Sequence, residues 1–264
     1  MLNQPRKISH SDSIISQFTK QAVPFLRMSQ HSNQYGLNLV VKLSDPKYDD
    51  TVLDVACGPG IVACEFAKIV NHVIGIDLTP AMIEQAKHLQ NEKDLHNIDW
   101  RVGDVSKLPY KDDSFSLIVT RYSLHHLINP SEVITEMYRV CRPGGRILVV
   151  DVTPPEVKKN AYNYVEKLRD PSHAEALTFI ELKRMVESKG FININTESQD
   201  LEMNLESLIS SSFPNPKNKD EIIRLFKKDI SSDILGMKSY LKDNEKYFFF
   251  PVSLIVAYKP KQSI

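Results

Sequence analysis

The chain of 264 residues is long enough to bury one large core, and its 33 basic side chains balance its 33 acidic ones. With 42% hydrophobic and 25% charged residues, its composition is that of a globular protein and excludes a disordered or fibrous chain. A net charge of zero without a long basic block argues against a nucleic-acid-binding protein, which usually carries a positive electrostatic footprint.

Two amphipathic helical stretches precede the first expected strand. They cover residues 12–29 and 32–43, and Pro24 is expected to interrupt the first of them. We expect residues 1–45 to form a helical cap or lid, and the alternative is that they cover a face of the sheet. The opening MLNQPRKISHSDS has no apolar segment typical of a secretory signal, so we expect a cytoplasmic protein without stable membrane insertion.

Five β-rich segments alternate with helical patterns in the middle of the chain. The expected strands cover residues 51–56, 72–77, 98–104, 114–120 and 146–152. Short connections between alternating strands and helices predict an α/β protein with a Rossmann-like, doubly wound parallel sheet.

The C-terminal part predicts two more strands and a helical insert. The strands are expected at 191–198 and 248–259, and regular pairing of the last one should start at or after Pro251, which has no N–H. Residues 201–246 look mostly helical. We therefore expect an insert at 201–246 between two parts of the core, 46–200 and 247–264.

A glycine-rich turn carries the sharpest chemical signal. Gly58-x-Gly60-x-x-Ala63 follows a strand and precedes a helix, and Asp77 ends the next strand. This arrangement fits the dinucleotide-binding fingerprint, in which the acid accepts hydrogen bonds from the ribose hydroxyls. The sequence therefore predicts a site for an adenosine-containing ligand.

The charge around this turn distinguishes between ligands. Asp54 lies four residues before Gly58, Pro59 removes one N–H donor, and residues 51–65 contain no lysine or arginine. A dianionic pyrophosphate requires N–H donors and no nearby carboxylate. A cation such as S-adenosylmethionine would instead be attracted by Asp54, which can equally be a strand-end residue hydrogen-bonded to loop amides.

Two further groups are candidates for the adenine site. After the third strand, Gly103 and Asp104 place a carboxylate where it could accept a hydrogen bond from the adenine amino group, with Val105 against the ring. An ordinary Asp N-cap is the alternative for Asp104. Leu78 and Met82 could cover the other face of adenine, although core packing competes for Met82.

These residues resemble the motif series of class I S-adenosylmethionine-dependent methyltransferases, and more narrowly the ubiquinone/menaquinone-biosynthesis (UbiE-like, type 11) group. The resemblance rests on Asp54-x-x-x-Gly58-x-Gly60, Asp77, Gly103-Asp104 and Arg142-Pro143-Gly144-Gly145. It is strong over 51–152 and weaker over 17–25 and 169–173. It implies a seven-stranded sheet whose last strand is antiparallel. Ala56 replaces a glycine that is frequent in this family, and we expect this departure to be mild.

The acceptor side of the site is expected after the fourth strand. His125 or His126 could act as a general base, and the alternative is that one stacks near the cofactor and neither transfers a proton. Arg121 could bind the cofactor carboxylate or an anionic substrate, or pair with an acid such as Asp151. Arg169 and His173 could reach the same mouth, but their motif indicates no mechanism.

We therefore predict a methyltransferase that uses S-adenosylmethionine and acts on a small molecule, with aromatic and quinone-like acceptors as candidates. The alternatives are an NAD-dependent oxidoreductase and a protein that binds S-adenosylmethionine without transferring methyl. No nucleic-acid partner and no metal site are expected, and a homodimer stays open. Three cysteines are expected to be buried thiols, which disfavours arsenic methylation: Cys57, Cys64 and Cys141.

Overall fold

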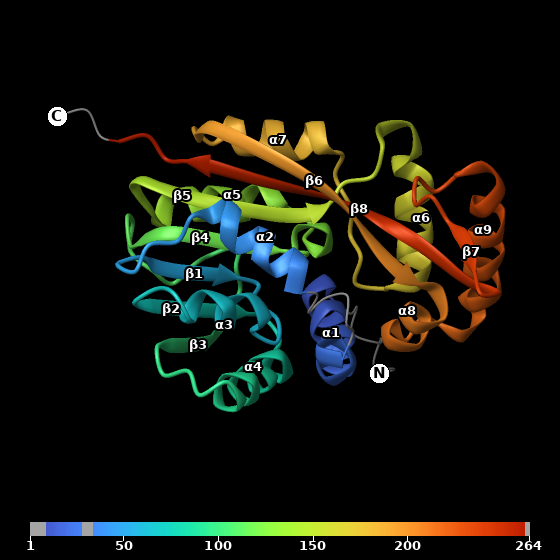
Figure 1. The fold of residues 1–264 in the computed structure, drawn as a ribbon, viewed down its shortest axis with the longest axis horizontal. Helices are drawn as coiled ribbons and strands as arrows, with labels where there is room; N and C mark the ends of the chain where they lie inside the picture. The colour runs from blue at the N-terminus through green and yellow to red at the C-terminus, as the bar shows by residue number, and fades with distance from the viewer. Residues whose placement is uncertain (1–8, 28–33, 262–264) are drawn as a thin grey trace, which may run out of the picture.

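A mixed β-sheet with helices on both faces forms the body of the protein (Figure 1). The computed structural model describes residues 9–27 and 34–261. The strands are β1 (Thr51–Val55), β2 (His72–Asp77), β3 (Ile98–Val102), β4 (Phe115–Arg121), β5 (Cys141–Val152), β6 (Ile192–Asn204), β7 (Tyr240–Lys242) and β8 (Glu245–Tyr258).

The strand order is β3-β2-β1-β4-β5-β8-β6, and β7 pairs with β8 outside this path. The first five strands are mutually parallel, whereas β8 runs antiparallel to both β5 and β6. The predicted Rossmann-like sheet with an antiparallel last strand is therefore confirmed. The carboxyl ends of β1, β2, β3 and β4 meet at one edge, where an open α/β sheet places its ligand.

The central helices cover the two faces of this sheet. They are α3 (Ile61–Ala67), α4 (Pro80–Glu92), α5 (Pro130–Val140) and α7 (Phe179–Ser188), whereas α6 (Lys159–Arg169) lies beyond the end of β5 (Figure 1). The predicted capping box starts α7, because Thr178 accepts from Glu181 N–H and Glu181 accepts from Thr178 N–H. Adjacent side chains of β1 point to opposite faces of the sheet, so that Val52 belongs to one hydrophobic cluster and Leu53 to the other.

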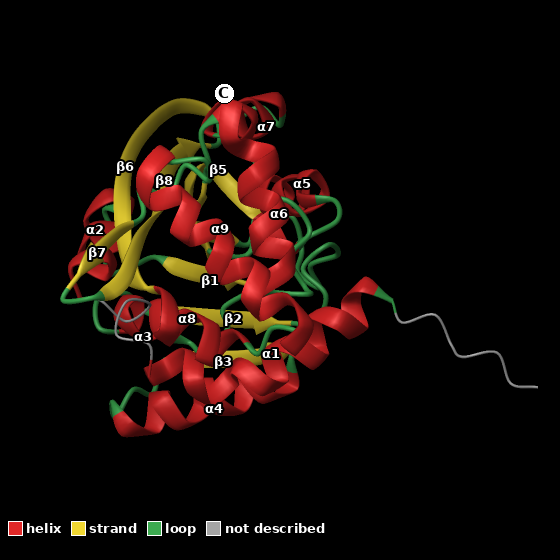
Figure 2. Cartoon of the chain, turned by 90° about the vertical axis from the view of Figure 1, so that its right-hand side faces the viewer, coloured by secondary structure: helices red, strands yellow, loops and turns green. Residues whose placement is uncertain are grey.

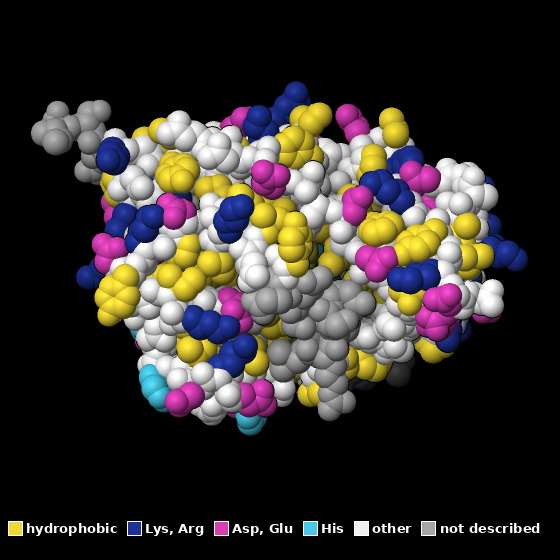
Figure 3. All heavy atoms as spheres, viewed as in Figure 1, with side chains coloured by type: hydrophobic (Ala, Val, Ile, Leu, Met, Phe, Trp, Pro, Cys, Tyr) yellow, Lys and Arg dark blue, Asp and Glu magenta, His cyan; other side chains and the backbone are white. Residues whose placement is uncertain are grey.

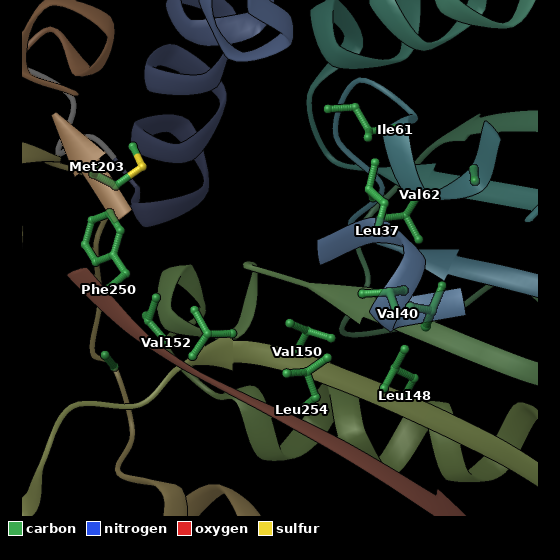
Figure 4. Close-up of a cluster of buried hydrophobic side chains, with 14 of the residues drawn as sticks. Leu37, Val40, Ile61, Val62, Leu148, Val150, Val152, Met203, Phe250 and Leu254 are labelled. Atoms are coloured by element: carbon green, nitrogen blue, oxygen red, sulfur yellow. The ribbon is translucent and has the colours of Figure 1, made fainter. Parts of the chain in front are cut away.

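The two N-terminal helices pack against different parts of the protein. α2 (Gln34–Ser44) lies over the face that carries α3, and Leu37 and Val40 point toward Val62 and Leu148 (Figure 4). α1 (His10–Arg27) contacts α4 and α8 instead. The expected interruption at Pro24 is wrong, because the helix continues to Arg27. Pro24 lies in the last part of α1, so its missing N–H removes a hydrogen bond only near the helix end.

The segment 201–246 holds the predicted helices, and it also has strand residues at both ends. It contains α8 (Leu205–Ser212) and α9 (Lys219–Ser232), but it begins inside β6 and ends in β7 and the start of β8. The long β6–β8 pair thus extends beyond β5 and carries α8 and α9 beside α6, on the side that faces the viewer in Figure 2. Three short 3-10 segments complete the helical elements, at Leu124–His126, Glu156–Lys158 and Pro216–Asn218.

Pro251 lies within β8, so the expected start of pairing at or after this residue is also wrong. β8 begins at Glu245, and Pro251 pairs with Asp200 of β6. The carbonyl of Pro251 accepts from the N–H of Thr153, just past the end of β5. Because N and C=O of one strand residue face the same side, the missing N–H faces the place where β5 has ended, and no bond to β6 is lost.

Basic and acidic side chains are interspersed on the face shown in Figure 3. Within residues 9–27 and 34–261, no helix is both long enough and apolar enough to cross a membrane.

Candidate active site

The turn after β1 has a backbone conformation that allows a ligand to come close to its main chain. Gly58 has φ +51° and Gly60 has φ +80°, which are left-handed conformations. A Cβ on Gly60 would lie 2.6 Å from the ring of Trp100, whereas nothing lies within 4 Å of a Cβ built on Gly58. Gly60 is therefore required by packing, and the backbone at Gly58 is open to a ligand.

Ala56 also adopts a left-handed conformation, with φ +56°. An L-residue with a Cβ pays about 1–2 kcal/mol for that conformation, a cost that glycine avoids. The replacement of glycine by alanine at this position is consequently less mild than expected, because the turn constrains the backbone angle φ of this residue as well as the space for its side chain.

Two buried aspartates brace the turn. Oδ2 of Asp54 accepts from Ala63 N–H at 3.0 Å, in the first turn of α3. Asp77 accepts from Gly58 N–H at 2.9 Å with Oδ2 and from Thr79 N–H at 2.8 Å with Oδ1. Burial, with the nearby charge of Asp77, raises the pKa of Asp54 to about 8, and burial also raises the pKa of Asp77.

A pocket of about 370 Å³ opens beside this turn. Its volume is within the range of small-molecule sites. Ten of the predicted site residues line it, namely Asp54, Ala56, Gly58, Asp77, Leu78, Met82, Asp104, Val105, Arg121 and His126. Gly60, Gly103 and His125 are not part of its wall. A Cβ on Gly103 would lie 3.0 Å from Ile76, so that glycine serves packing.

Asp104 and Arg121 have contacts that bear on their predicted roles. Oδ1 of the exposed Asp104 accepts from Ser106 N–H at 2.8 Å, which is the N-cap-like contact of the alternative interpretation. The guanidinium of Arg121 lies 4.5 Å from the ring centroid of Tyr122. Asp151, the alternative partner considered for Arg121, is hydrogen-bonded to His125.

Helix α1 closes the pocket, and sequence reasoning named none of its residues as site residues. His10, Ser11, Ile14 and Phe18 line the pocket wall. Nε2 of His10 lies 2.6 Å from the carbonyl oxygen of His126, which ties α1 to the loop after β4. The amphipathic pattern of α1 and its resemblance to relatives were the available signals.

His125 forms a buried pair with Asp151 at the end of β5. Its Nδ1 lies 2.5 Å from Oδ1 of Asp151, and its backbone N–H donates to Oδ2 at 3.2 Å. Burial pushes the pKa of His125 down, but the charge and hydrogen bond of Asp151 outweigh it, so that the pKa lies above its ordinary value. Nε2 of His125 has no hydrogen-bond partner within the described ranges.

His126 and His173 are held as neutral imidazoles. Nδ1 of His126 lies 3.2 Å from the carbonyl oxygen of Ser172 and 3.1 Å from its hydroxyl oxygen. Burial and the charge of His125 lower the pKa of His126 to about 3. Nε2 of His173 lies 2.7 Å from Oδ1 of Asn163, and burial lowers the pKa of His173. His126 faces the main pocket, whereas His173 does not reach its wall.

A second cavity of about 60 Å³ lies beside the main pocket. Both cavities share Phe18, Tyr122 and His126 as wall residues. The rest of the smaller cavity comes from distant parts of the chain, including α6, β6, α8 and β8. Arg169, whose role the sequence did not indicate, belongs to its wall.

Metal ligation and thiol chemistry find no support in the described residues. Within 9–27 and 34–261, no three His, Cys, Asp or Glu side chains are placed to hold a metal ion. All three cysteines are buried and free, as predicted. Burial raises the pKa of Cys64 and Cys141 to about 12.

Comparisons with known proteins agree with this geometry. Residues 53–149 match the family model described as a methyltransferase domain. The chain is 30% identical over 194 residues to the uncharacterized methyltransferase YcgJ of Bacillus subtilis, covering 73% of this chain and 77% of that protein. The crystal structure of YcgJ superposes with a TM-score of 0.79 at 28% identity, covering 86% of this chain and 99% of that one. A demethylmenaquinone methyltransferase of Listeria welshimeri is 32% identical over 120 residues, 44% of this chain and 51% of that enzyme.

Proposed function

This chain belongs to the family of S-adenosylmethionine-dependent methyltransferases, and on that premise we propose that it binds S-adenosylmethionine beside the β1 turn and methylates a small molecule. The cofactor supplies a methyl group on a positively charged sulfur. The residues of the chain have to hold the cofactor, align the acceptor and exclude water.

The observation that carries the proposal is the excess of acids in the pocket. Its described wall holds four carboxylates and one guanidinium, from Asp54, Asp77, Asp104, Glu132 and Arg121. A ligand with sulfonium and ammonium charges would stabilise the ionised form of Asp54, whose pKa is about 8 without it. A pyrophosphate would instead oppose the ionisation of Asp54 and would be repelled by those of the acids that are ionised, which disfavours an NAD-dependent oxidoreductase.

Asp77 is suited to a ribose. Each of its oxygens accepts one backbone N–H and keeps a further lone pair for a ribose hydroxyl. Leu78, Met82 and Val105 offer apolar contacts to the base, and Asp104 offers an acceptor for its amino group. Arg121 is the cation in the wall that could bind the carboxylate end of the cofactor.

For catalysis, we assign the proton acceptor to His125 rather than His126. Asp151 holds Nδ1 of His125 and raises its pKa, which leaves Nε2 to accept a proton. His126, with a pKa of about 3, is a neutral group that positions the ligand. Ile14 and Phe18 of α1 exclude water from the pocket.

The acceptor is proposed to have an aromatic or otherwise apolar body. The apolar side chains of Phe18, Tyr122 and Phe250 around the cavities support this, as does the similarity to a demethylmenaquinone methyltransferase.

Calorimetry tests the cofactor assignment directly. S-adenosylhomocysteine should bind the protein and raise its melting temperature, and NAD⁺ should do neither; the reverse result would end the proposal. Asp77→Asn should weaken binding of S-adenosylhomocysteine by ~1.5–3 kcal/mol, because a charge-assisted hydrogen bond is lost.

A transfer assay separates methyl transfer from binding alone. The protein is incubated with methyl-labelled S-adenosylmethionine and a small-molecule extract. A labelled small-molecule product supports transfer, and its absence supports a binding protein.

A further inference from the structure

We propose that the smaller cavity is the acceptor subsite and that it takes the amine head group of an acceptor with an apolar body. This inference rests on the proposed function, because it gives the substrate class of the same site. Its position is the first argument: a head group in this cavity lies behind Phe18, Tyr122 and His126, which are also walls of the cofactor pocket.

The second argument is an unbalanced set of buried charges. Arg169 forms a two-pronged ion pair with Glu166, at 3.0 and 2.7 Å, and lies 3.8 Å from Asp170. Glu166 and Asp170 are each 2% exposed and Arg169 is 8% exposed. Two carboxylates therefore face one guanidinium in the wall of the cavity.

The neighbouring groups do not supply the missing positive charge. His125 is neutral before the proton transfer, and even as an imidazolium it supplies only the charge that balances its partner Asp151. His126 faces the carbonyl of Ser172; the charge of Asp170 acts to raise the pKa of His126, but burial and the charge of His125 outweigh it and keep the ring neutral. One buried negative charge in the wall of the cavity is thus left without a positive partner. A buried charge is stabilised when a group of opposite charge lies next to it.

The third argument is the aromatic lining. Phe18, Tyr122 and Phe250 line this cavity, and Val152 and Leu208 add apolar surface. A cation against aromatic faces gains a favourable electrostatic interaction. An ammonium group satisfies both the aromatic rings and the excess carboxylate, whereas a hydroxyl leaves the charge unbalanced and a carboxylate adds to it.

The proton balance of such a transfer uses His125. An ammonium head first gives a proton to Nε2 of His125, and the resulting imidazolium is held by Asp151. The amine lone pair then forms the N–C bond while the C–S bond breaks and its electron pair stays on sulfur. The products are S-adenosylhomocysteine and a methylated ammonium, so the positive charge of the sulfonium ends on nitrogen.

Three probes of one shape test the head-group class: benzylamine, benzyl alcohol and benzoate. Each is titrated calorimetrically into the protein saturated with S-adenosylhomocysteine. Benzylamine should bind about tenfold more tightly than benzyl alcohol, and benzoate should be weakest. Equal binding of the amine and the alcohol, or tighter binding of benzoate, would overturn the inference.

A pair of α8 variants tests the location. Ser211 lines the cavity and Ser210 is exposed, while both hydroxyls donate to the carbonyl of Ser207. Ser211→Leu should fill the cavity and abolish benzylamine binding, and Ser210→Leu should leave it unchanged. Both should bind S-adenosylhomocysteine like wild type. Equal effects of the two substitutions would place the amine elsewhere.

A charge variant completes the design. Glu166→Gln keeps the shape of the side chain but removes the leftover negative charge. The preference for benzylamine over benzyl alcohol should fall by about tenfold. Should Glu166→Gln fail to fold, the Ser211→Leu and Ser210→Leu comparison decides the inference. If S-adenosylhomocysteine itself fails to bind wild type, the proposed function fails and the inference falls with it; loss of the amine preference alone overturns only the inference.

Discussion

Nδ1 of His125 lies 2.5 Å from Oδ1 of Asp151, and both side chains are buried. Two opposing effects therefore set the pKa of this histidine. Burial favours the neutral ring, and the carboxylate favours the charged ring more strongly. This pairing turns an ordinary imidazole into a stronger proton acceptor at the edge of the acceptor cavity.

Asp151→Asn should lower the pKa of His125 below that of the free side chain. Burial, which favours the neutral ring, is then no longer opposed by the charge of Asp151. An NMR titration of the imidazole signals checks this without a known acceptor. Methyl transfer should slow, while affinity for S-adenosylhomocysteine stays at the wild-type value. An unchanged His125 titration in the variant would contradict the assigned role of Asp151.

Asp54→Asn should change how stability depends on pH. The folded-state pKa of about 8 lies above the ordinary 3.8, so the native state holds a proton that the unfolded chain has lost. The free energy of unfolding of the wild type should therefore fall as pH rises from about 4 to about 8. Urea unfolding at pH 5 and pH 8 should show a smaller fall for Asp54→Asn. The exposed Asp49→Asn serves as the control and should keep the wild-type dependence.

Ala56→Gly should stabilise the protein by about 1 kcal/mol, because glycine adopts φ +56° without the steric cost of a Cβ. Chemical denaturation measures this directly. The same exchange at Ala86, inside α4, should destabilise the protein instead. A loss of stability in Ala56→Gly would show that the methyl group contributes packing that outweighs the backbone cost.

Gly75→Ala should destabilise the protein by about 1–3 kcal/mol, because its Cβ would lie 2.4 Å from the ring of Trp100. Trp100→Leu removes that ring and should recover part of the loss in the double variant. A double-mutant cycle on the free energies of unfolding gives the coupling. Additive effects would mean that the clash is relieved elsewhere.

The sequence predicted the parts of the site that follow one another along the chain. The turn from β1 to α3 and Asp77 lie within a short βαβ unit, where local spacing determines spatial position. The positive φ of Ala56 could not be predicted in this way. The turn imposes that backbone angle, and alanine is not a residue type that indicates it.

The acceptor cavity could not be predicted for a different reason. Its walls come from segments far apart in sequence, such as Phe18, Arg169 and Ser212, where Arg169 donates to the hydroxyl of Ser212 at 2.8 Å. Nothing in local periodicity indicates that these residues meet. The strand content at both ends of 201–246 was missed because it depends on the length of the β6–β8 pairing, a long-range property.

Phe18 of helix α1 lines both cavities. Most of the acceptor cavity's wall, including this helix and α8, lies outside the residues 53–149 that match the family model. The turn after β1 and Asp77 thus lie within the matched residues, whereas α8 lies outside them. A substitution in α8 can therefore reshape the acceptor cavity without changing a wall residue of the cofactor pocket.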